Sequence, residues 1–347
     1  MPKTHTLFFT APKKVEIRET SLPALKDDEV LVNTICSAIS AGTEMLVYRG
    51  EFPHLANSHD SVSSDLNYPL AYGYACVGKV MDIGKSVNSA WLNRLVFSFR
   101  PHSSHFVIKI ESLILIPDSL TPETACFLPN IETAVNLVQD GAPIVGERVL
   151  VLGQGVVGLL TASLLSEFPL ESLVTVDHYE LRRNALKVES QRLKIKSLPP
   201  YDLQPLTLRQ AQGNAFDLLQ SGADLTFELS GSPSALNDAI ALTAFSGRVV
   251  IGSWYGQKRA EIDLGGAFHR SRIKLISSQV STISPELSGR WDKSRRFDVA
   301  WKALERIKPE KWITHRFALS DAEKAYRLLD ENPQETIQII FEYKNVL

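Results

Sequence analysis

Hydrophobic and polar residues alternate through much of the first third of the chain. A period of two is typical of strands with one buried face. The alternation, with Gly and Pro between its segments, predicts a small β-barrel or sandwich. We expect strands at residues 15–18, 29–35, 78–84, 94–99 and 105–110. The polar stretch 51–68, which contains His54, His59 and Asp60, predicts a long loop of the kind that often binds a ligand.

The pattern changes near residue 121 to short apolar runs that alternate with helical segments. Thr121 and Pro122 suit the N-cap and first turn of a helix. Apolar strands separated by helices predict a parallel sheet with crossover connections. The expected strands are 148–152, 172–177, 224–229 and 247–252, and the expected helices between them are 156–165, 178 to about 193, and 234–244. Towards the C-terminus we expect helices 297–307 and 320–329 and a last strand 337–341.

Composition limits the function classes. The chain has 347 residues, which favours about two domains, with 44% hydrophobic and 22% charged residues. A net charge of −2 argues against non-specific electrostatic binding to nucleic acid. The uncharged stretch 149–166 is long enough to suggest a membrane span, but its glycines favour a strand, a turn and a helix. We therefore expect no membrane association and no nucleic-acid partner.

The cysteines and the N-terminus favour a cytoplasmic protein. Three isolated cysteines, Cys36, Cys76 and Cys126, fit a reducing compartment, and we expect them to be buried thiols. The first residues lack the apolar core of a signal peptide.

A glycine-rich turn follows the first apolar strand of the second pattern. Gly153, Gly155 and Gly158 form G-x-G-x-x-G between a predicted strand and a predicted helix. In that context the turn and the helix N-terminus bind the pyrophosphate of a dinucleotide. Asp177 ends the next strand, about 20 residues on, where a carboxylate binds ribose hydroxyls and repels a 2′-phosphate. NAD(H) is therefore expected rather than NADP(H). Arg182 and Arg183, one turn into the next predicted helix, are expected to form a solvated face, and the alternative is that they reach a phosphate.

Several motifs in order resemble the medium-chain dehydrogenase/reductase superfamily of the zinc alcohol dehydrogenase type. They are Ser-Ala-Gly-Thr-Glu at 40–44, Tyr-Arg-Gly at 48–50, Tyr-Gly-Tyr-Ala-Cys-Val-Gly at 72–78, Leu-Pro-Asn-Ile-Glu-Thr-Ala at 128–134, the glycine turn, Glu-Leu-Ser-Gly-Ser-Pro at 228–233 and the segment 315–326. The resemblance implies an α/β fold with two domains. A GroES-like β-barrel catalytic domain would comprise residues 1–122 and 281–347, and a Rossmann domain with a doubly wound parallel sheet would comprise residues 123–280, with the active site in the cleft.

The chain departs from that superfamily at the zinc ligands. It has Ala41 in place of the first cysteine, Tyr74 in place of the ligand histidine, and Pro129-Asn130 near the third ligand. A catalytic zinc needs three protein ligands of thiolate, imidazole or carboxylate type. The four-cysteine lobe that holds structural zinc is also missing. We therefore expect no zinc.

Without a metal, hydrogen-bond donors must stabilise charge on the substrate oxygen. Thr43 stands at the hydroxyl position of the zinc family's proton relay, and Tyr74 carries a phenol at a ligand position. His102 and His105 lie on one short loop, and imidazoles titrate near neutral pH. The catalytic candidates are Thr43, Tyr74 and His102; Glu44 is expected to order the loop. The cofactor-binding candidates, from the turn and the resemblance, are Thr133, Gly153, Gly155, Val156, Val157, Gly158, Asp177, His178, Arg182, Ser230, Gly231, Gly252 and Ser253.

The sequence thus predicts a zinc-independent, NAD(H)-dependent alcohol/carbonyl oxidoreductase. Its substrate is a small molecule, and a ring compound is one candidate, since bacteriochlorophyllide dehydrogenases carry a similar Gly-Thr-Glu segment. Two alternatives stay open: an NADPH-dependent enone or quinone reductase, and a nucleotide-binding protein without catalysis. The resemblance also implies a homodimer formed through the sheet edge near 265–280. The basic run Arg290, Lys293, Arg295 and Arg296 is expected to form a solvated face rather than to receive an acidic substrate.

Overall fold

The chain forms two compact units. The computed structural model describes residues 3–52, 66–186, 195–200 and 221–343. One unit comprises Met1–Pro129 and Leu304–Leu347, and the other comprises Asn130–Ala303. The second boundary lies later than the predicted 280/281. The physical reason is helix α8 (Lys293–Ile307), whose Arg296 pairs with Glu132 of helix α3 (Leu128–Gly141) at 2.8 Å and so ties residues up to 303 to the second unit.

The first unit is built on two sheets of mainly antiparallel strands. A three-stranded sheet has the order β2-β1-β4, with β1 (Lys3–Ala11), β2 (Lys14–Ser21) and β4 (Leu70–Ala71). The larger sheet has the order β15-β16-β3-β5-β6-β8, and β7 also pairs with β3. Its strands are β3 (Glu29–Ala38), β5 (Cys76–Ile83), β6 (Leu95–Ser98), β7 (His105–Lys109), β8 (Ile114–Leu115), β15 (Ile313–Ala318) and β16 (Gln338–Glu342). The final strand therefore joins the sheet begun by β3, so both ends of the chain build this unit.

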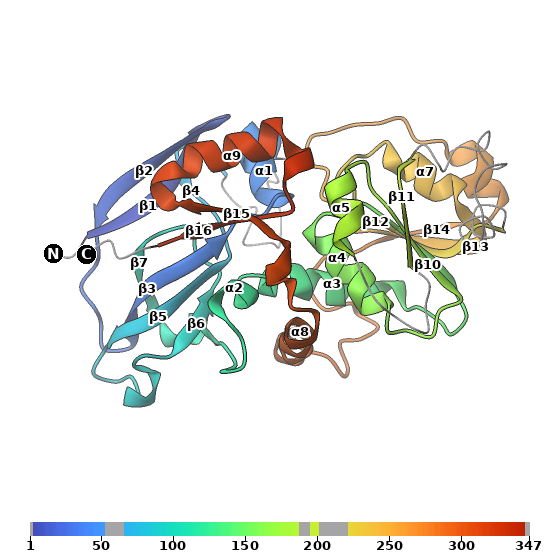
Figure 1. Ribbon diagram of the computed structural model, residues 1–347. Helices are drawn as coiled ribbons and strands as arrows, with labels where there is room; N and C mark the ends of the chain where they lie inside the picture. Colours follow the sequence, from blue (N-terminus) through green and yellow to red (C-terminus); the bar gives the residue numbers. More distant parts are fainter. Residues whose placement is uncertain (1–2, 53–65, 187–194, 201–220, 344–347) are drawn as a thin grey trace. The chain divides into compact units, whose positions relative to one another are not determined.

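In the described part of this unit, three α-helices that lie wholly within it accompany these sheets. They are α1 (Thr43–Arg49), α2 (Pro122–Ala125) and α9 (Ala322–Glu331). Thr121 caps α2 as the sequence predicts, because its side chain accepts a hydrogen bond from the Thr124 amide. Figure 1 shows α9 lying along β1 and β2, where Tyr326 packs edge-on against Phe9 with ring centroids 5.2 Å apart. This contact belongs to the main apolar core of the unit.

The second unit holds a six-stranded parallel sheet in the order β11-β10-β9-β12-β13-β14. Its strands are β9 (Arg148–Leu152), β10 (Ser172–Val176), β11 (Ile195–Leu198), β12 (Ala223–Glu228), β13 (Thr243–Ile251) and β14 (Lys274–Ser277). The chain runs outward from β9 to β11 and then returns to place β12 on the other side of β9. Ligands of open α/β sheets bind at such a switch point, outside the carboxyl ends of the strands.

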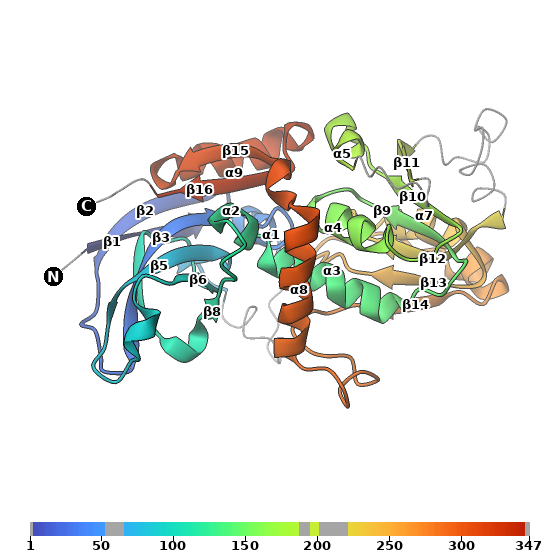
Figure 2. The ribbon, with the colours of Figure 1, turned by 60° about the horizontal axis from the view of Figure 1, so that its bottom comes forward.

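The crossover helices agree with the predicted pattern. They are α4 (Val156–Leu165), α5 (Glu180–Ala185) and α7 (Ala235–Ala241). The second half of the predicted helix 178–193 lies outside the described residues from 187 onward. Helix α7 ends earlier than predicted because β13 already begins at Thr243. In Figure 2, helix α8 crosses α3 at a steep angle, and the Arg296–Glu132 ion pair joins the two helices.

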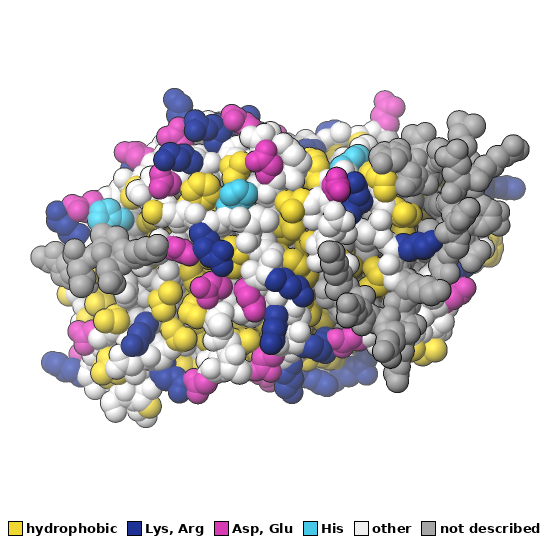
Figure 3. All heavy atoms as spheres, in the orientation of Figure 1, with side chains coloured by type: hydrophobic (Ala, Val, Ile, Leu, Met, Phe, Trp, Pro, Cys, Tyr) yellow, Lys and Arg dark blue, Asp and Glu magenta, His cyan; other side chains and the backbone are white. Residues whose placement is uncertain are grey.

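Two surface properties complete the fold. On the face shown in Figure 3, Lys and Arg side chains are interspersed with Asp and Glu, in keeping with the small net charge. Within the described ranges, no helix has both the length and the apolarity needed to cross a membrane. The uncharged stretch 149–166 forms β9, the glycine turn and α4, as predicted.

Candidate functional site

The glycine turn has the shape that a dinucleotide needs. Gly153 adopts a φ of 93°, and a Cβ built on it would lie 2.5 Å from the Leu229 carbonyl oxygen. A Cβ on Gly158 would lie 1.9 Å from the Gly153 oxygen, so only glycine lets helix and turn approach this closely. A Cβ on Gly155, the N-cap of α4, would have no atom of the described residues within 4 Å. The turn therefore leaves open space in front of a helix N-terminus, which suits a pyrophosphate.

Asp177 lies beside this turn. It is only 7% exposed, and its Oδ2 accepts the Gln154 amide at 2.7 Å while Oδ1 accepts the Tyr179 amide at 2.8 Å. Each carboxylate oxygen has two lone pairs, so one on each stays available for ribose hydroxyls. Val156 and Val157 begin the adjacent helix, and His178 next to Asp177 is exposed.

The two arginines of α5 do not form a solvated face. Arg183 donates through Nη1 to the carbonyl oxygens of Asp177 (2.9 Å) and His178 (2.7 Å), so it holds the end of β10. The Arg182 guanidinium lies 4.8 Å from the centre of the Tyr179 ring, and burial lowers its pKa from the usual value.

The loops that follow strands β12 and β13 are hydrogen-bonded to each other. The Gly231 amide donates to Ser253 Oγ at 2.9 Å, and the Gly252 amide donates to the Glu228 carbonyl at 3.1 Å. Ser230 follows Glu228 at the same edge of the sheet. Most cofactor candidates lie directly after a strand of the parallel sheet. The glycine turn follows β9, residues 177–182 follow β10, residues 230–231 follow β12, and residues 252–253 follow β13. Thr133 instead lies half-buried on α3.

Sequence reasoning missed the buried carboxylate of Glu228. It is fully buried and accepts the Ser230 amide at 2.8 Å and the Tyr255 hydroxyl at 2.5 Å. Burial and the Glu228 charge raise the pKa of Tyr255. The available signal was an acid at the end of an otherwise apolar strand, where its carboxylate can order the loops that follow.

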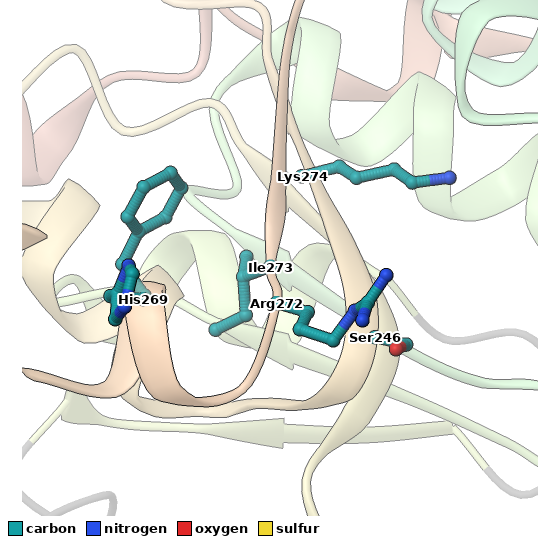
Figure 4. Close-up of a pocket in the computed structure, with 6 residues that line it drawn as sticks. Ser246, His269, Arg272, Ile273 and Lys274 are labelled. Atoms are coloured by element: carbon teal, nitrogen blue, oxygen red, sulfur yellow. The ribbon is translucent and has the colours of Figure 1, made fainter.

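A cavity of about 400 Å³ lies at the other edge of this sheet. Figure 4 shows its lining, which comprises Ser246, Phe268, His269, Arg272, Ile273 and Lys274. Ser246 lies in the first half of β13 and Lys274 begins β14, so the cavity lies at the amino ends of the parallel strands. The side chains of His269 and Lys274 point to opposite sides (Figure 4). This cavity is therefore separate from the nucleotide turn and presents no converging set of charges.

The catalytic candidates lie in the first unit. Thr43 begins α1 directly after the exposed residues Ala41 and Gly42. The Tyr74 hydroxyl donates to Ser40 Oγ at 2.5 Å. Burial and the nearby Glu44 carboxylate raise the pKa of Tyr74 to about 12, so its phenol keeps its proton at neutral pH. We call Ser40, Thr43 and Tyr74, all half-buried, the hydroxyl cluster.

A fully buried network lies behind the hydroxyl cluster. Glu44 is 0% exposed, and its Oε2 bonds to His102 Nε2 at 2.9 Å and accepts the Tyr326 hydroxyl at 2.7 Å. The other ring nitrogen of His102 bonds to Ser37 Oγ at 2.7 Å. His102 is likewise 0% exposed. Its hydrogen bond to Glu44 holds that carboxylate in place. The expectation that Glu44 orders its loop agrees with its bond to the Ser40 amide at 2.9 Å.

The positions of the expected zinc ligands hold no metal-binding group. Ala41 has no donor atom, and the Tyr74 phenol is engaged by Ser40. Among the described residues there is no group of three or more His, Cys, Asp or Glu side chains arranged to hold a metal ion. His54, His59 and Asp60 lie outside the described residues. All three cysteines are buried free thiols, as predicted, with Cys36 and Cys126 Sγ atoms 3.3 Å apart.

The basic run 290–296 does not form the solvated face that the sequence predicts. Arg296 is 0% exposed and donates to Glu132 and Asn136, while Lys293 also bonds to Glu132 at 2.8 Å. Arg295 remains exposed over the Trp291 ring at 4.2 Å. The prediction was wrong for Arg296 because its carboxylate partner lies far away in the sequence.

A parallel sheet with a dinucleotide-type turn, carried by a chain whose two ends build a separate β-rich unit, is typical of two-domain, nucleotide-dependent dehydrogenases. No family model matches the chain. Individual curated proteins are similar to it. The starvation-sensing protein RspB of Escherichia coli K12 is 20% identical over 371 residues, which cover 97% of this chain and 99% of the relative. An L-threonine 3-dehydrogenase of Xanthomonas euvesicatoria is 20% identical, covering 92% of this chain and 94% of its own.

Solved structures show the same fold. RspB from E. coli CFT073, determined with NADH, superposes with a TM-score of 0.74 at 18% identity and covers 98% of this chain and 99% of its own. A zinc-dependent alcohol dehydrogenase 2 from Streptococcus pneumonia superposes with a TM-score of 0.77 at 19% identity and covers 99% of both chains. Over nearly its whole length the chain is thus similar in sequence to curated dehydrogenases of the medium-chain, zinc-type alcohol dehydrogenase group, and it has the fold of the solved members of that group.

Proposed function

We propose that this protein is a zinc-independent, NAD(H)-dependent oxidoreductase that interconverts an alcohol and a carbonyl group on a small molecule, ring compounds included. The observation that carries the proposal is the open glycine turn with Asp177 beside it, combined with the Tyr74 phenol at a ligand position of the zinc relatives and the hydroxyls of Ser40 and Thr43 next to it. The RspB structure with NADH supports the choice of cofactor.

The residues of the second unit fit a dinucleotide. Gly153, Gly155, Gly158 and the α4 amides would hold the pyrophosphate, and Asp177 would bind the adenosine ribose. When bound, the nicotinamide supplies or accepts a hydride. The protein's own task is to stabilise and protonate the substrate oxygen, and we assign this task to the hydroxyl cluster, with Thr43 and Tyr74 as sources of the hydrogen bonds and the proton.

Hydride turnover tests the proposal. Oxidation of NADH and NADPH is followed by absorbance with a panel of aldehydes, ketones, enones and quinones, and the reverse reaction with alcohols. We expect NADH oxidation with a carbonyl compound, about 10²-fold slower in Tyr74→Phe and in Thr43→Val, with an unchanged dissociation constant for NADH. NADPH-dependent enone or quinone reduction would favour the first alternative. NADH binding without turnover on any compound would favour the non-catalytic alternative.

Metal analysis tests zinc independence. The motivation is that Ala41, Tyr74 and the pair Pro129-Asn130 supply no thiolate, imidazole or carboxylate. We expect less than stoichiometric zinc in protein purified without chelator, and activity that survives dialysis against a chelator. About one zinc per chain would overturn the claim.

We also propose a cytoplasmic homodimer. The edge strand β14 leaves one side of the six-stranded sheet open to pair with a second copy, as the superfamily resemblance implies. Light scattering at micromolar concentration should report twice the mass of one chain, 38.6 kDa each. A monomer mass at that concentration would exclude the dimer.

A further inference from the structure

Within the described part of the chain, the Ser40 hydroxyl is hydrogen-bonded as an acceptor. Its Oγ accepts the Tyr74 hydroxyl at 2.5 Å. Among the described residues no acceptor for the Ser40 O–H is present, although a hydroxyl can donate one hydrogen bond as well as accept two. The Tyr74 proton, in contrast, is directed at Ser40. Of the two hydroxyls, Ser40 therefore has the free donor.

The backbone holds Ser40 in place from both sides. Its amide donates to Glu44 Oε1 at 2.9 Å, and its carbonyl accepts the Glu44 amide at 3.1 Å. Glu44 is in turn fixed by His102 and Tyr326 through its second oxygen. A catalytic group that must keep its geometry needs this kind of support.

Ser40 is also within reach of a ligand. It is half-buried, and the next two residues, Ala41 and Gly42, are exposed. Glu44 and His102 are buried completely. The half-buried hydroxyl cluster thus adjoins a fully buried polar network, and Ser40 is bonded to the Tyr74 phenol and directly precedes the exposed residues Ala41 and Gly42 in the chain.

We propose that Ser40 is the catalytic residue that donates the proton to the substrate oxygen during carbonyl reduction, and that Tyr74 acts behind it to return the proton. This inference rests on the proposed function and deepens it, because it assigns the direct donor to a residue that the sequence motifs did not single out.

The proton transfers balance as follows. As the carbonyl carbon gains its hydride, the C=O π electrons move to oxygen, the Ser40 O–H bond breaks and an O–H bond forms on the substrate. The Tyr74 O–H bond breaks and restores the Ser40 hydroxyl. The tyrosinate regains a proton from water after product release. The product alkoxide is a stronger base than tyrosinate, so the overall transfer is downhill even with a raised phenol pKa.

Kinetics of matched serine variants test the proposal. Ser40→Ala should lower kcat by about 10²-fold or more, because a positioned proton donor contributes at least that much, and should leave the NADH dissociation constant unchanged. Ser40→Thr, which keeps a hydroxyl, should recover most of the rate. The control is Ser98→Ala in the same unit, because Ser98 Oγ is buried without a hydrogen-bond partner among the described residues.

The double variant separates a relay from two independent donors. If Ser40 and Tyr74 act in series, Ser40→Ala combined with Tyr74→Phe should be no slower than the slower single variant. If the rate losses of the two single variants multiply in the double variant, Tyr74 contacts the substrate directly, and the relay is overturned. A Ser40→Ala enzyme with full activity would also overturn it, while the proposed function would stand. A wild-type protein inactive on the whole panel would instead overturn the proposed function.

A spectroscopic readout is independent of turnover. The chain has 9 tyrosines, and fluorotyrosine labelling gives each its own fluorine resonance in NMR. The Tyr74 resonance is identified by its loss in Tyr74→Phe. We expect it to shift in Ser40→Ala and to stay in place in Ser98→Ala. An unchanged Tyr74 resonance in Ser40→Ala would mean that the two hydroxyls are not bonded in solution, and the relay would be excluded.

Discussion

Single buried carboxylates organise both candidate regions. In the first unit Glu44 holds the Ser40 amide with one oxygen and His102 and Tyr326 with the other. In the second unit Asp177 joins the glycine turn to the start of α5. A buried carboxylate that accepts several hydrogen bonds is rigid as well as charged, so each acid fixes a loop and sets the local charge.

The charge of Asp177 should decide which dinucleotide binds. A 2′-phosphate beside this carboxylate is a like-charge contact in a nearly buried place, so NADH should bind more tightly than NADPH. In Asp177→Asn we expect the preference for NADH to fall by about tenfold or more, which corresponds to about 1.4 kcal/mol. Fluorescence titration with both cofactors measures it. Asp224→Asn, at the amino edge of the same sheet, is the control and should keep the wild-type preference. Equal preference in wild type would mean that Arg182 controls the pocket.

At the scale of elements, α3 and α8 are joined by a buried polar link. Arg296 donates to Glu132 (2.8 Å), to Asn136 (2.5 Å) and to the carbonyl oxygens of Val280 and Thr282. The segment that follows β14 is thereby tied to both helices. Because every donor of this guanidinium lies away from water, its loss would leave the buried Glu132 carboxylate with the partly exposed Lys293 as its remaining cationic partner and Asn136 without its donor.

Removal of Arg296 should therefore destabilise the protein strongly. Arg296→Leu is expected to lower the free energy of unfolding by about 3–5 kcal/mol, as for other broken buried ion pairs. Urea unfolding measures the change. The neighbouring exposed residue gives the control: Arg295→Leu should change the stability by less than about 1 kcal/mol. Adding Glu132→Gln to Arg296→Leu should restore part of the loss, and a double variant no more stable than Arg296→Leu would contradict the assigned pair.

At the scale of the whole molecule, ion pairs at the amino edge of the parallel sheet link stability to pH. Burial alone would raise the pKa of Asp224, but hydrogen bonds from Arg148 outweigh it and the pKa lies below its usual value. The same holds for Glu147, where burial is outweighed by Arg248. Both carboxyls thus bind protons more weakly in the folded than in the unfolded chain.

Acid should remove the stability that these pairs contribute. The pKa values of Asp224 and Glu147 are lower in the folded protein than in the unfolded chain, where they are about 3.9 and 4.3. The stabilisation is therefore complete above these unfolded-state pKa values and is lost as the pH falls through the folded-state pKa values. We expect the free energy of unfolding to decrease steeply between about pH 4 and pH 2. Urea unfolding at several pH values measures the slope. Asp224→Asn should reduce the slope, and an unchanged slope would show that this carboxylate does not contribute.

Elements with a strong local pattern could be predicted from the sequence, and elements without one could not. The period-two strands of the first unit, the capped helix at Thr121 and the strand–turn–helix around Gly153 all form as predicted. Strands β1, β11 and β15 were not predicted. Strand β11 has only four residues and mixes charged with apolar side chains, and it forms because the parallel strand β10 supplies its hydrogen bonds.

The sequence by itself determined the order of elements and the nucleotide turn, because alternation, capping and the need for glycine are properties of neighbouring residues. The tertiary structure alone decided which side chains meet. Tyr74 and Ser40 are 34 positions apart, and Tyr326 and Glu44 are 282 apart. The burial of Arg296 likewise depends on Glu132, 164 positions away. No local pattern encodes such pairs, because their energy comes from charge and hydrogen bonding in an interior that exists only after the chain has folded.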